Sequence, residues 1–147
     1  MKALIKNITH SSTGIDALAL RLAAGVIFTA HGAQKLFAWF GGYGLEGTAG
    51  WMASIGLEPG YLLALMAGSA EFFGGLFLIL GLLVRPAGVV LALTMMVAIV
   101  SVHLEHGLFM SNNGYEFALS LLAISVGLAF RGAGSISLDR ELHKKLA

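Results

Sequence analysis

An imidazole, an amide and two cations interrupt one long apolar stretch of the chain. The stretch reads RLAAGVIFTAHGAQKLFAWF, and its polar members are Arg21, His31, Gln34 and Lys35. A second apolar stretch, residues 61–83, carries a carboxylate, Glu71, near its middle. Imidazole and carboxylate groups can transfer protons, and a lysine can stabilise negative charge that develops on an oxygen. These residue types could therefore support proton-coupled chemistry on a small molecule.

Composition indicates the class of protein that must position these groups. Of the 147 residues, 57% are hydrophobic and 12% are charged, whereas a soluble domain is nearer half apolar and about a quarter charged. We therefore expect one polytopic membrane domain, residues 1–147. The formal net charge of +1 gives no electrostatic case for binding nucleic acid. The chain has no cysteine, which excludes a dithiol relay and an all-cysteine metal site within it. Redox chemistry would need a quinone, a bound cofactor or a partner protein.

Four apolar runs predict an all-α fold, a bundle of four transmembrane helices. Their approximate bounds are 17–40, 61–83, 84–102 and 115–130. About 20 residues cross the hydrocarbon core, and long runs without alternation indicate helices rather than barrel strands. The loops 41–60 and 104–114 contain no Lys or Arg, while the basic residues lie at the opposite ends of the spans. The positive-inside rule then places both termini in the cytoplasm.

Helical spacing and depth bring some of the polar groups together. Arg21 and Lys35 fall on one stripe of the first span, with His31 on its flank. Glu71 is at the centre of a face of small residues in the second span, and such faces let helices approach closely. With a rise of about 1.5 Å per residue, His31 lies roughly 9 Å and Glu71 roughly 13 Å inside the outer boundary. We expect Glu71 to face the interior and to pair with His31 or Lys35, because a bare carboxylate there is costly.

The remaining candidates lie near the predicted outer boundary. His103 ends the third span, and Glu116 begins the fourth, where it could complete a capping box with Asn113. Glu116 is also an alternative surface partner for Lys35. The cluster HLEH, residues 103–106, contains ligand types that would suit a metal. Its spacing fits no established site, so a solvated loop end is favoured and no metal is predicted.

Four stretches, in a fixed order along the chain, carry a resemblance to a known family. They are R…HGAQK (Arg21 to Lys35), EFFGGLFLILGLLVR (71–85), NNGYEFAL (112–119) and GAGSISLD (132–139). With them the sequence resembles the DoxX family of small bacterial membrane proteins over nearly its whole length. The resemblance implies a multi-pass four-helix bundle in the bacterial inner membrane. It also implies a link to respiratory or redox-stress systems, because the founding members look like subunits of a thiosulfate-oxidising, quinone-reducing complex.

The first functional interpretation is a membrane subunit of a quinone-linked oxidoreductase. His31, Lys35 and Glu71 would then be the catalytic groups, and the ligand would also meet Arg21, Gln34, His103 and Glu116. The site should open in the outer half of the bundle, with apolar walls expected from Phe28, Trp39 or Phe72. The chain itself would hold no redox cofactor, so electrons would come from a hetero-subunit.

Two other interpretations remain open at this point. A buried acid and imidazole are also typical of a proton-coupled transporter or sensor of small molecules. Alternatively, the polar cluster fixes helix register and the chain is a scaffold without chemistry of its own. Four short helices bury few internal positions, which favours a homodimer or a hetero-complex.

Overall fold

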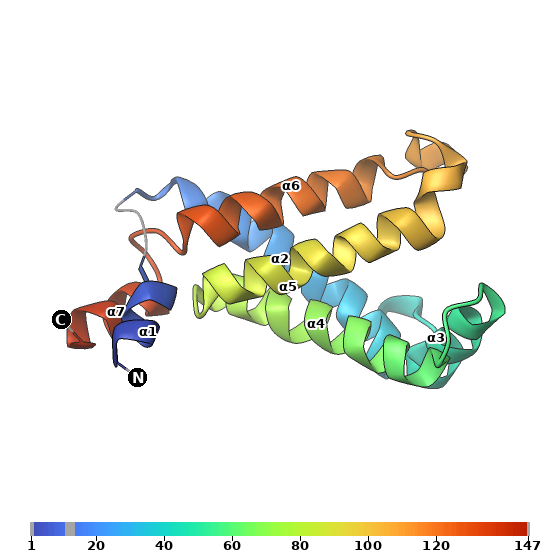
Figure 1. Ribbon diagram of the computed structural model, residues 1–147, viewed down its shortest axis with the longest axis horizontal. Helices are drawn as coiled ribbons and strands as arrows, with labels where there is room; N and C mark the ends of the chain where they lie inside the picture. Colours follow the sequence, from blue (N-terminus) through green and yellow to red (C-terminus); the bar gives the residue numbers. More distant parts are fainter. Residues whose placement is uncertain (1, 11–13, 147) are drawn as a thin grey trace.

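The computed structural model describes residues 2–10 and 14–146, and all regular elements within these ranges are helices. In chain order they are α1 (Lys2–Ile8), α2 (Asp16–Phe37), α3 (Gly44–Ser54), α4 (Gly60–Leu80), α5 (Val84–Ala98), α6 (Glu116–Arg131) and α7 (Leu138–Leu146). The four long helices α2, α4, α5 and α6 run lengthwise through the molecule (Figure 1). Helix α3 lies at one end of this bundle, while α1, α7 and both termini lie at the other. The predicted all-α class is thus confirmed.

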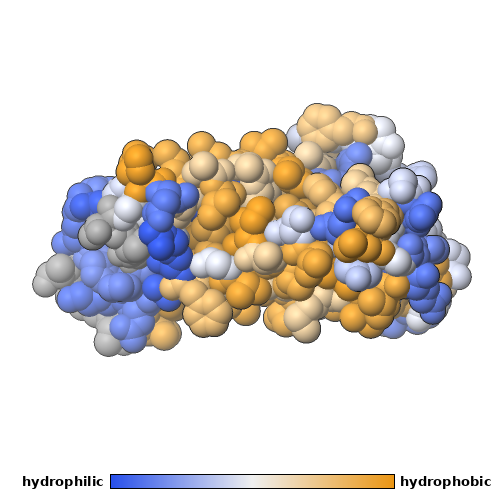
Figure 2. Space-filling view, turned by 90° about the horizontal axis from the view of Figure 1, so that it is seen from above, coloured by the Kyte–Doolittle hydropathy of each residue, from blue (hydrophilic) through white to orange (hydrophobic). Residues whose placement is uncertain are grey.

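Hydrophobic residues form a broad belt across the middle of the molecule in Figure 2, between two more polar ends. Two of the described helical segments, Gly60–Leu80 and Val84–His106, are long and apolar enough to cross a membrane. Polar side chains lower the mean hydropathy of α2, and α6 has only 16 residues. The four-span count and the orientation of the termini therefore stay predictions.

The helices end close to the predicted bounds, with local backbone reasons for the differences. Helix α2 ends at Phe37, earlier than the predicted bound at residue 40, because Ala38 and Phe40 adopt left-handed conformations. Helix α4 ends at Leu80, and the next residue, Gly81, has a φ of 67° that suits a residue without a side chain. Helix α5 continues as a π-helical turn over Ile99–His103.

Small residues allow α2 and α4 to pack closely. A Cβ atom added to Gly32 would lie only 2.6 Å from the Cα atom of Phe72. A Cβ atom on Gly75 would lie 2.5 Å from the backbone nitrogen of Thr29. No side chain fits at either position without a shift of backbone. The small face predicted for the second span is therefore the face that contacts α2, and it sets the spacing of the polar groups.

A buried carboxylate fastens the C-terminal segment to the turn between α4 and α5. The two side-chain oxygens of Asp139 accept hydrogen bonds from the backbone nitrogens of Leu83 (2.7 Å) and Val84 (3.0 Å). The backbone nitrogen of Asp139 donates to the carbonyl of Gly81 at 2.9 Å. Burial raises the pKa of Asp139, although these backbone donors act in the opposite direction. The start of α5 is thus capped by a residue 55 positions away.

Candidate functional site

Lys35 and Glu71 form an ion pair across the interface of α2 and α4. The Nζ atom of Lys35 lies 2.6 Å from the Oε2 atom of Glu71. The Glu71 side chain is 4% exposed, whereas that of Lys35 is 25% exposed. This geometry confirms that Glu71 faces the interior and pairs with a basic group of the first span. The carboxylate of the pair is therefore buried away from water, while the lysine side chain is partly exposed at the surface.

A cavity of about 320 Å³ lies beside the exposed end of this pair. Lys35 and Gln34, from the last turns of α2, form one wall. The opposite side comes from the following loop and from α3, and it includes Tyr43, Thr48 and Trp51. Lys35 therefore belongs both to the cavity wall and to the buried pair, and it links the cavity to Glu71.

Local hydrogen bonds hold the loop and α3 against the end of α2. The amide of Gln34 donates to the carbonyl of Phe40 at 3.3 Å, and the hydroxyl of Thr48 donates to the carbonyl of Lys35 at 3.4 Å. A Cβ atom on Gly42 would lie 2.5 Å from the Cα atom of Gln34, so the loop can pass this close only with glycine. The cavity is thus shaped by hydrogen bonds from two side chains to backbone carbonyls and by the close backbone approach at Gly42.

The aromatic residues that line the cavity differ from those predicted. Phe28 is 1% exposed and belongs to the hydrophobic core. Trp39 and Phe72 both pack against the ring of Phe37, with centroids 5.3 and 5.2 Å away. None of the three predicted residues is among those that line the cavity. The prediction was wrong because it used depth along straight helices and assigned no wall to the segment between the first two spans.

Tyr43 and Trp51 supply the aromatic groups instead. Both belong to the segment of residues 41–60, which the hydropathy pattern treats only as a loop. The signal that could have located the wall is the sequence GTAGWMASIGLEPG, an amphipathic stretch that carries a tryptophan. Residues 44–54 of this region form α3.

His31 lies on another side of α2. Its side chain is exposed, and its ring centroid is 6.0 Å from that of Phe117 in α6. It is one turn from Lys35, but 3.6-residue periodicity rotates it about 40° around the helix. Glu71 therefore forms its ion pair with Lys35 and not with His31.

His103 and Glu116 stabilise the loop between α5 and α6. The Nδ1 atom of His103 lies 2.8 Å from the carbonyl oxygen of Asn113, and a side-chain oxygen of Glu116 accepts a hydrogen bond from the backbone nitrogen of Met110 at 2.6 Å. The predicted capping box is absent, since α6 begins without a side-chain cap and Asn113 has a φ of 62°. Glu116 is therefore not the partner of Lys35.

Arg21 lies at the other end of the bundle. It is 1% exposed, and its guanidinium donates hydrogen bonds to the carbonyls of Ala133 (2.6 Å) and Ile136 (3.0 Å). Of the seven predicted site residues, the structure brings together Gln34, Lys35 and Glu71. Arg21, His31, His103 and Glu116 lie elsewhere.

Comparison with known proteins agrees with this architecture. The sequence model of the DoxX family matches residues 17–104, which include α3, α4, α5 and all but the first residue of α2. The chain is 38% identical over 135 residues to the Bacillus subtilis protein named "Putative oxidoreductase CatD", covering 92% of both chains. It is 30% identical over 146 residues to an uncharacterized membrane protein of Mycobacterium tuberculosis, covering 92% of this chain and 86% of that one. No solved structure matches the chain. The family match and the extent of these similarities show that this chain is a membrane protein of the DoxX family.

Proposed function

We propose that the outer cavity binds a quinone and that the protein is the membrane subunit of a quinone-linked oxidoreductase. The observation that carries this proposal is the position of Lys35, whose ammonium group both lines the cavity and pairs with a buried carboxylate. A cavity with apolar walls and a few polar groups suits a ring-shaped ligand. Tyr43 and Trp51 would pack against the ring, while Lys35 and Gln34 would donate hydrogen bonds to its carbonyl oxygens.

The pair would assist reduction by supplying charge and protons. Reduction of a quinone to a quinol takes two electrons and two protons. Lys35 would stabilise negative charge on a carbonyl oxygen and pass one proton to it. Water that enters the open cavity would supply the second proton and return the first to Lys35. Glu71 orients Lys35, because its buried carboxylate accepts a hydrogen bond from the ammonium group. The electrons would come from a hetero-subunit. The similarity to a Bacillus subtilis protein named as an oxidoreductase supports this assignment.

A proton-coupled carrier or sensor is the second candidate. The observation that favours it is the burial of the Glu71 carboxylate beside a group that reaches an open cavity, since such residues occur on proton and solute pathways. Accumulation of a solute in vesicles, driven by a pH gradient and abolished by Glu71→Gln, would favour this function over quinone reduction.

Quinone binding should be visible in the fluorescence of Trp51. The chain has two tryptophans, so the Trp39→Phe variant reports on Trp51 alone. A short-chain quinone titrated into the detergent-solubilised variant should quench this emission to saturation. The matched Trp51→Phe variant reports on Trp39, which is 55% exposed and does not line the cavity. Its emission should fall only in proportion to the quinone concentration. Equal, unsaturable quenching in both variants would contradict a site at the cavity.

The orientation in the bacterial inner membrane is a linked proposal. We place both termini in the cytoplasm and the cavity at the outer face, because the basic residues gather at the ends with α1 and α7. Single cysteines can replace the exposed residues Asn7, Ser54, Asn112 and Lys145 of the cysteine-free chain. An impermeant maleimide added to intact spheroplasts should label positions 54 and 112 only. Labelling of positions 7 and 145 instead would reverse the orientation.

A further inference from the structure

A second cavity, of about 500 Å³, lies at the opposite end of the bundle from the candidate site. It is bounded by the first turns of α2, the last turns of α4 and the segment that leads into α7, residues 135–138. Its apolar side includes Leu80 and Ile136, which are 51% and 58% exposed. Its polar side includes Arg21 and Ser137. The cavity is therefore amphipathic, with an open aliphatic side and a basic group within it.

The guanidinium of Arg21 has unused hydrogen-bonding capacity. A guanidinium carries five N–H donors, and the structure gives two of them acceptors, the carbonyls of Ala133 and Ile136. The Nε atom is buried and has no hydrogen-bond partner in the described part of the chain. Buried donors are seldom left without an acceptor. Both of the acceptors that are present are neutral, so they do not offset the positive charge.

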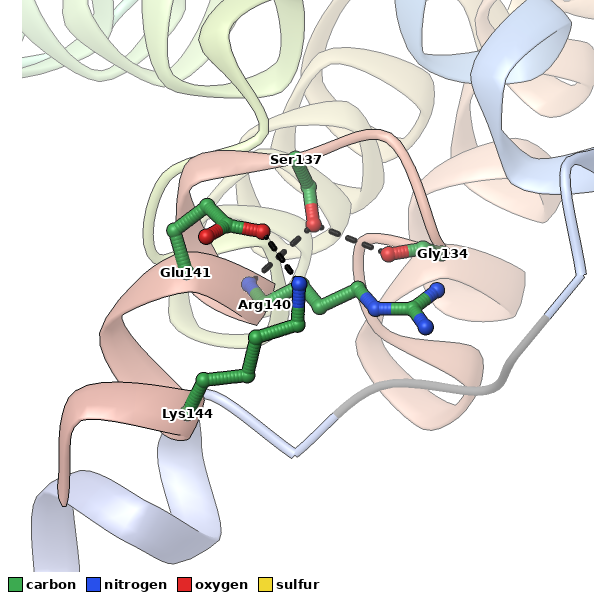
Figure 3. A network of polar contacts seen from close by, with 5 residues as sticks. All are labelled: Gly134, Ser137, Arg140, Glu141 and Lys144. Carbon is green, nitrogen blue, oxygen red and sulfur yellow. Dashed lines mark hydrogen bonds and ion pairs between the residues drawn. The ribbon is translucent and has the colours of Figure 1, made fainter. Parts of the chain in front are cut away.

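The carboxylates nearest to Arg21 are already engaged. Asp139 interacts with Arg21 through space, but both of its oxygens accept backbone hydrogen bonds from Leu83 and Val84. Glu141 lines the cavity, but its carboxylate accepts a hydrogen bond from Lys144 at 2.7 Å (Figure 3). Within the described ranges, no carboxylate forms an ion pair with Arg21. The buried cation therefore suits an anion that enters the cavity.

The wall beside Arg21 is polar and held in place. The hydroxyl of Ser137 donates to the carbonyl of Gly134 at 2.8 Å and accepts from the backbone nitrogen of Arg140 at 3.3 Å (Figure 3). Gly81 is also needed here, because a Cβ atom at that position would collide with the guanidinium of Arg21. The arginine is thus fixed in one position by the α4–α5 turn and the C-terminal segment.

We infer that this cavity binds a membrane phospholipid, with the phosphodiester near Arg21 and the glycerol and upper acyl chains along the aliphatic side. Arg21 lies five residues after the start of α2, about 7.5 Å along the helix axis. The polar head-group layer of a bilayer is about 5–7 Å thick on each side. A helix that begins at the outer edge of this layer places the guanidinium at its inner edge, beside the glycerol and phosphate groups of the lipid. Arginine is well suited to phosphate, because its planar group can donate two parallel hydrogen bonds. Leu80 and Ile136 are exposed where the chains of such a lipid would run.

Native mass spectrometry of the detergent-purified protein tests this inference. Wild type should retain one phospholipid per chain, and Leu80→Trp, which fills the cavity without changing Arg21, should reduce the retained fraction at least tenfold. Leu93→Trp is the matched control, because Leu93 is 56% exposed on α5 and lines neither cavity. Thermal unfolding followed by circular dichroism confirms that both variants are folded. Arg21→Gln should also lose the lipid, but Arg21 bonds the C-terminal segment, so Leu80→Trp decides the case if Arg21→Gln does not fold.

Added ligands distinguish the lipid from its parts. Delipidated wild type should rebind a phospholipid, but it should not bind diacylglycerol, which has the same chains without the phosphate. Inorganic phosphate and glycerol 3-phosphate at millimolar concentration should not displace the bound lipid. Equal retention by wild type and Leu80→Trp, binding of diacylglycerol, or displacement by free phosphate would each overturn the inference.

Discussion

Replacing Lys35 by Met is expected to destabilise the protein by about 3–5 kcal/mol, the cost of leaving a buried charge without its partner. The carboxylate of Glu71 is 4% exposed, so the surrounding helices exclude the water that would otherwise solvate it. It must then stay buried as an unpaired anion or take up a proton, and both cost free energy. The measurement is the free energy of unfolding from mixed micelles, followed by circular dichroism as the denaturing detergent increases.

The reverse change, Glu71→Gln, should cost less than Lys35→Met. The Lys35 side chain is 25% exposed and lines the cavity, so its ammonium group can reach water when the carboxylate is removed. The double variant should be more stable than the sum of the two single changes predicts, because it leaves no unpaired charge. Strictly additive effects would mean that the interaction between Lys35 and Glu71 contributes nothing to the free energy of unfolding.

Gly32→Ala should separate α2 from α4 and should also weaken the ion pair. The added methyl group would lie 2.6 Å from the Cα atom of Phe72, so backbone has to move. Overpacking of this kind costs about 1–3 kcal/mol and occasionally more. We therefore expect a loss of that size in the same unfolding experiment.

Gly127→Ala is the matched control for this prediction. Gly127 lies in α6, and a Cβ atom there meets no other atom within 4 Å. The substitution should leave stability unchanged or raise it slightly, because alanine is the better helix former. If Gly32→Ala were as stable as Gly127→Ala, the close approach of α2 and α4 would not be what positions Lys35 and Glu71.

The parts of the structure that could be predicted from the sequence depend on local periodicity. The bounds of α4 and α6 follow from continuous apolar runs. The pairing of Glu71 with a basic residue of α2 follows from one acid on a face of small residues, because that face can only serve close packing. Choosing between His31 and Lys35 required the rotation of α2 about its axis, and this rotation is set by contacts with α4 and α6 that periodicity does not contain.

The parts that were missed depend on segments distant in the sequence. Trp51 lines the cavity only because the chain turns back at Ala38 and places α3 beside the end of α2. Asp139 caps α5 from a position beyond α6, and its side chain gives no local sign of this role. The capping box at Asn113 and Glu116 failed because the loop backbone offered Glu116 a different donor, Met110. The contacts of Trp51 and Asp139 join segments distant in the sequence, whereas Glu116 exchanged one local partner for another within the same loop.

The central claim is that Lys35 contacts a quinone in the cavity that it lines, and it is tested most directly by the affinity of the Lys35→Gln variant. This change keeps a hydrogen-bond donor and removes the charge. Quinone titration of Trp51 emission in the Trp39→Phe background gives a dissociation constant for each protein, and circular dichroism on the same samples gives the folded fraction. We predict at least about a tenfold weaker affinity per folded molecule, equivalent to about 1.4 kcal/mol. An unchanged dissociation constant, with binding capacity that falls only as far as the folded fraction, would contradict the claim and leave the Lys35–Glu71 pair as a structural element.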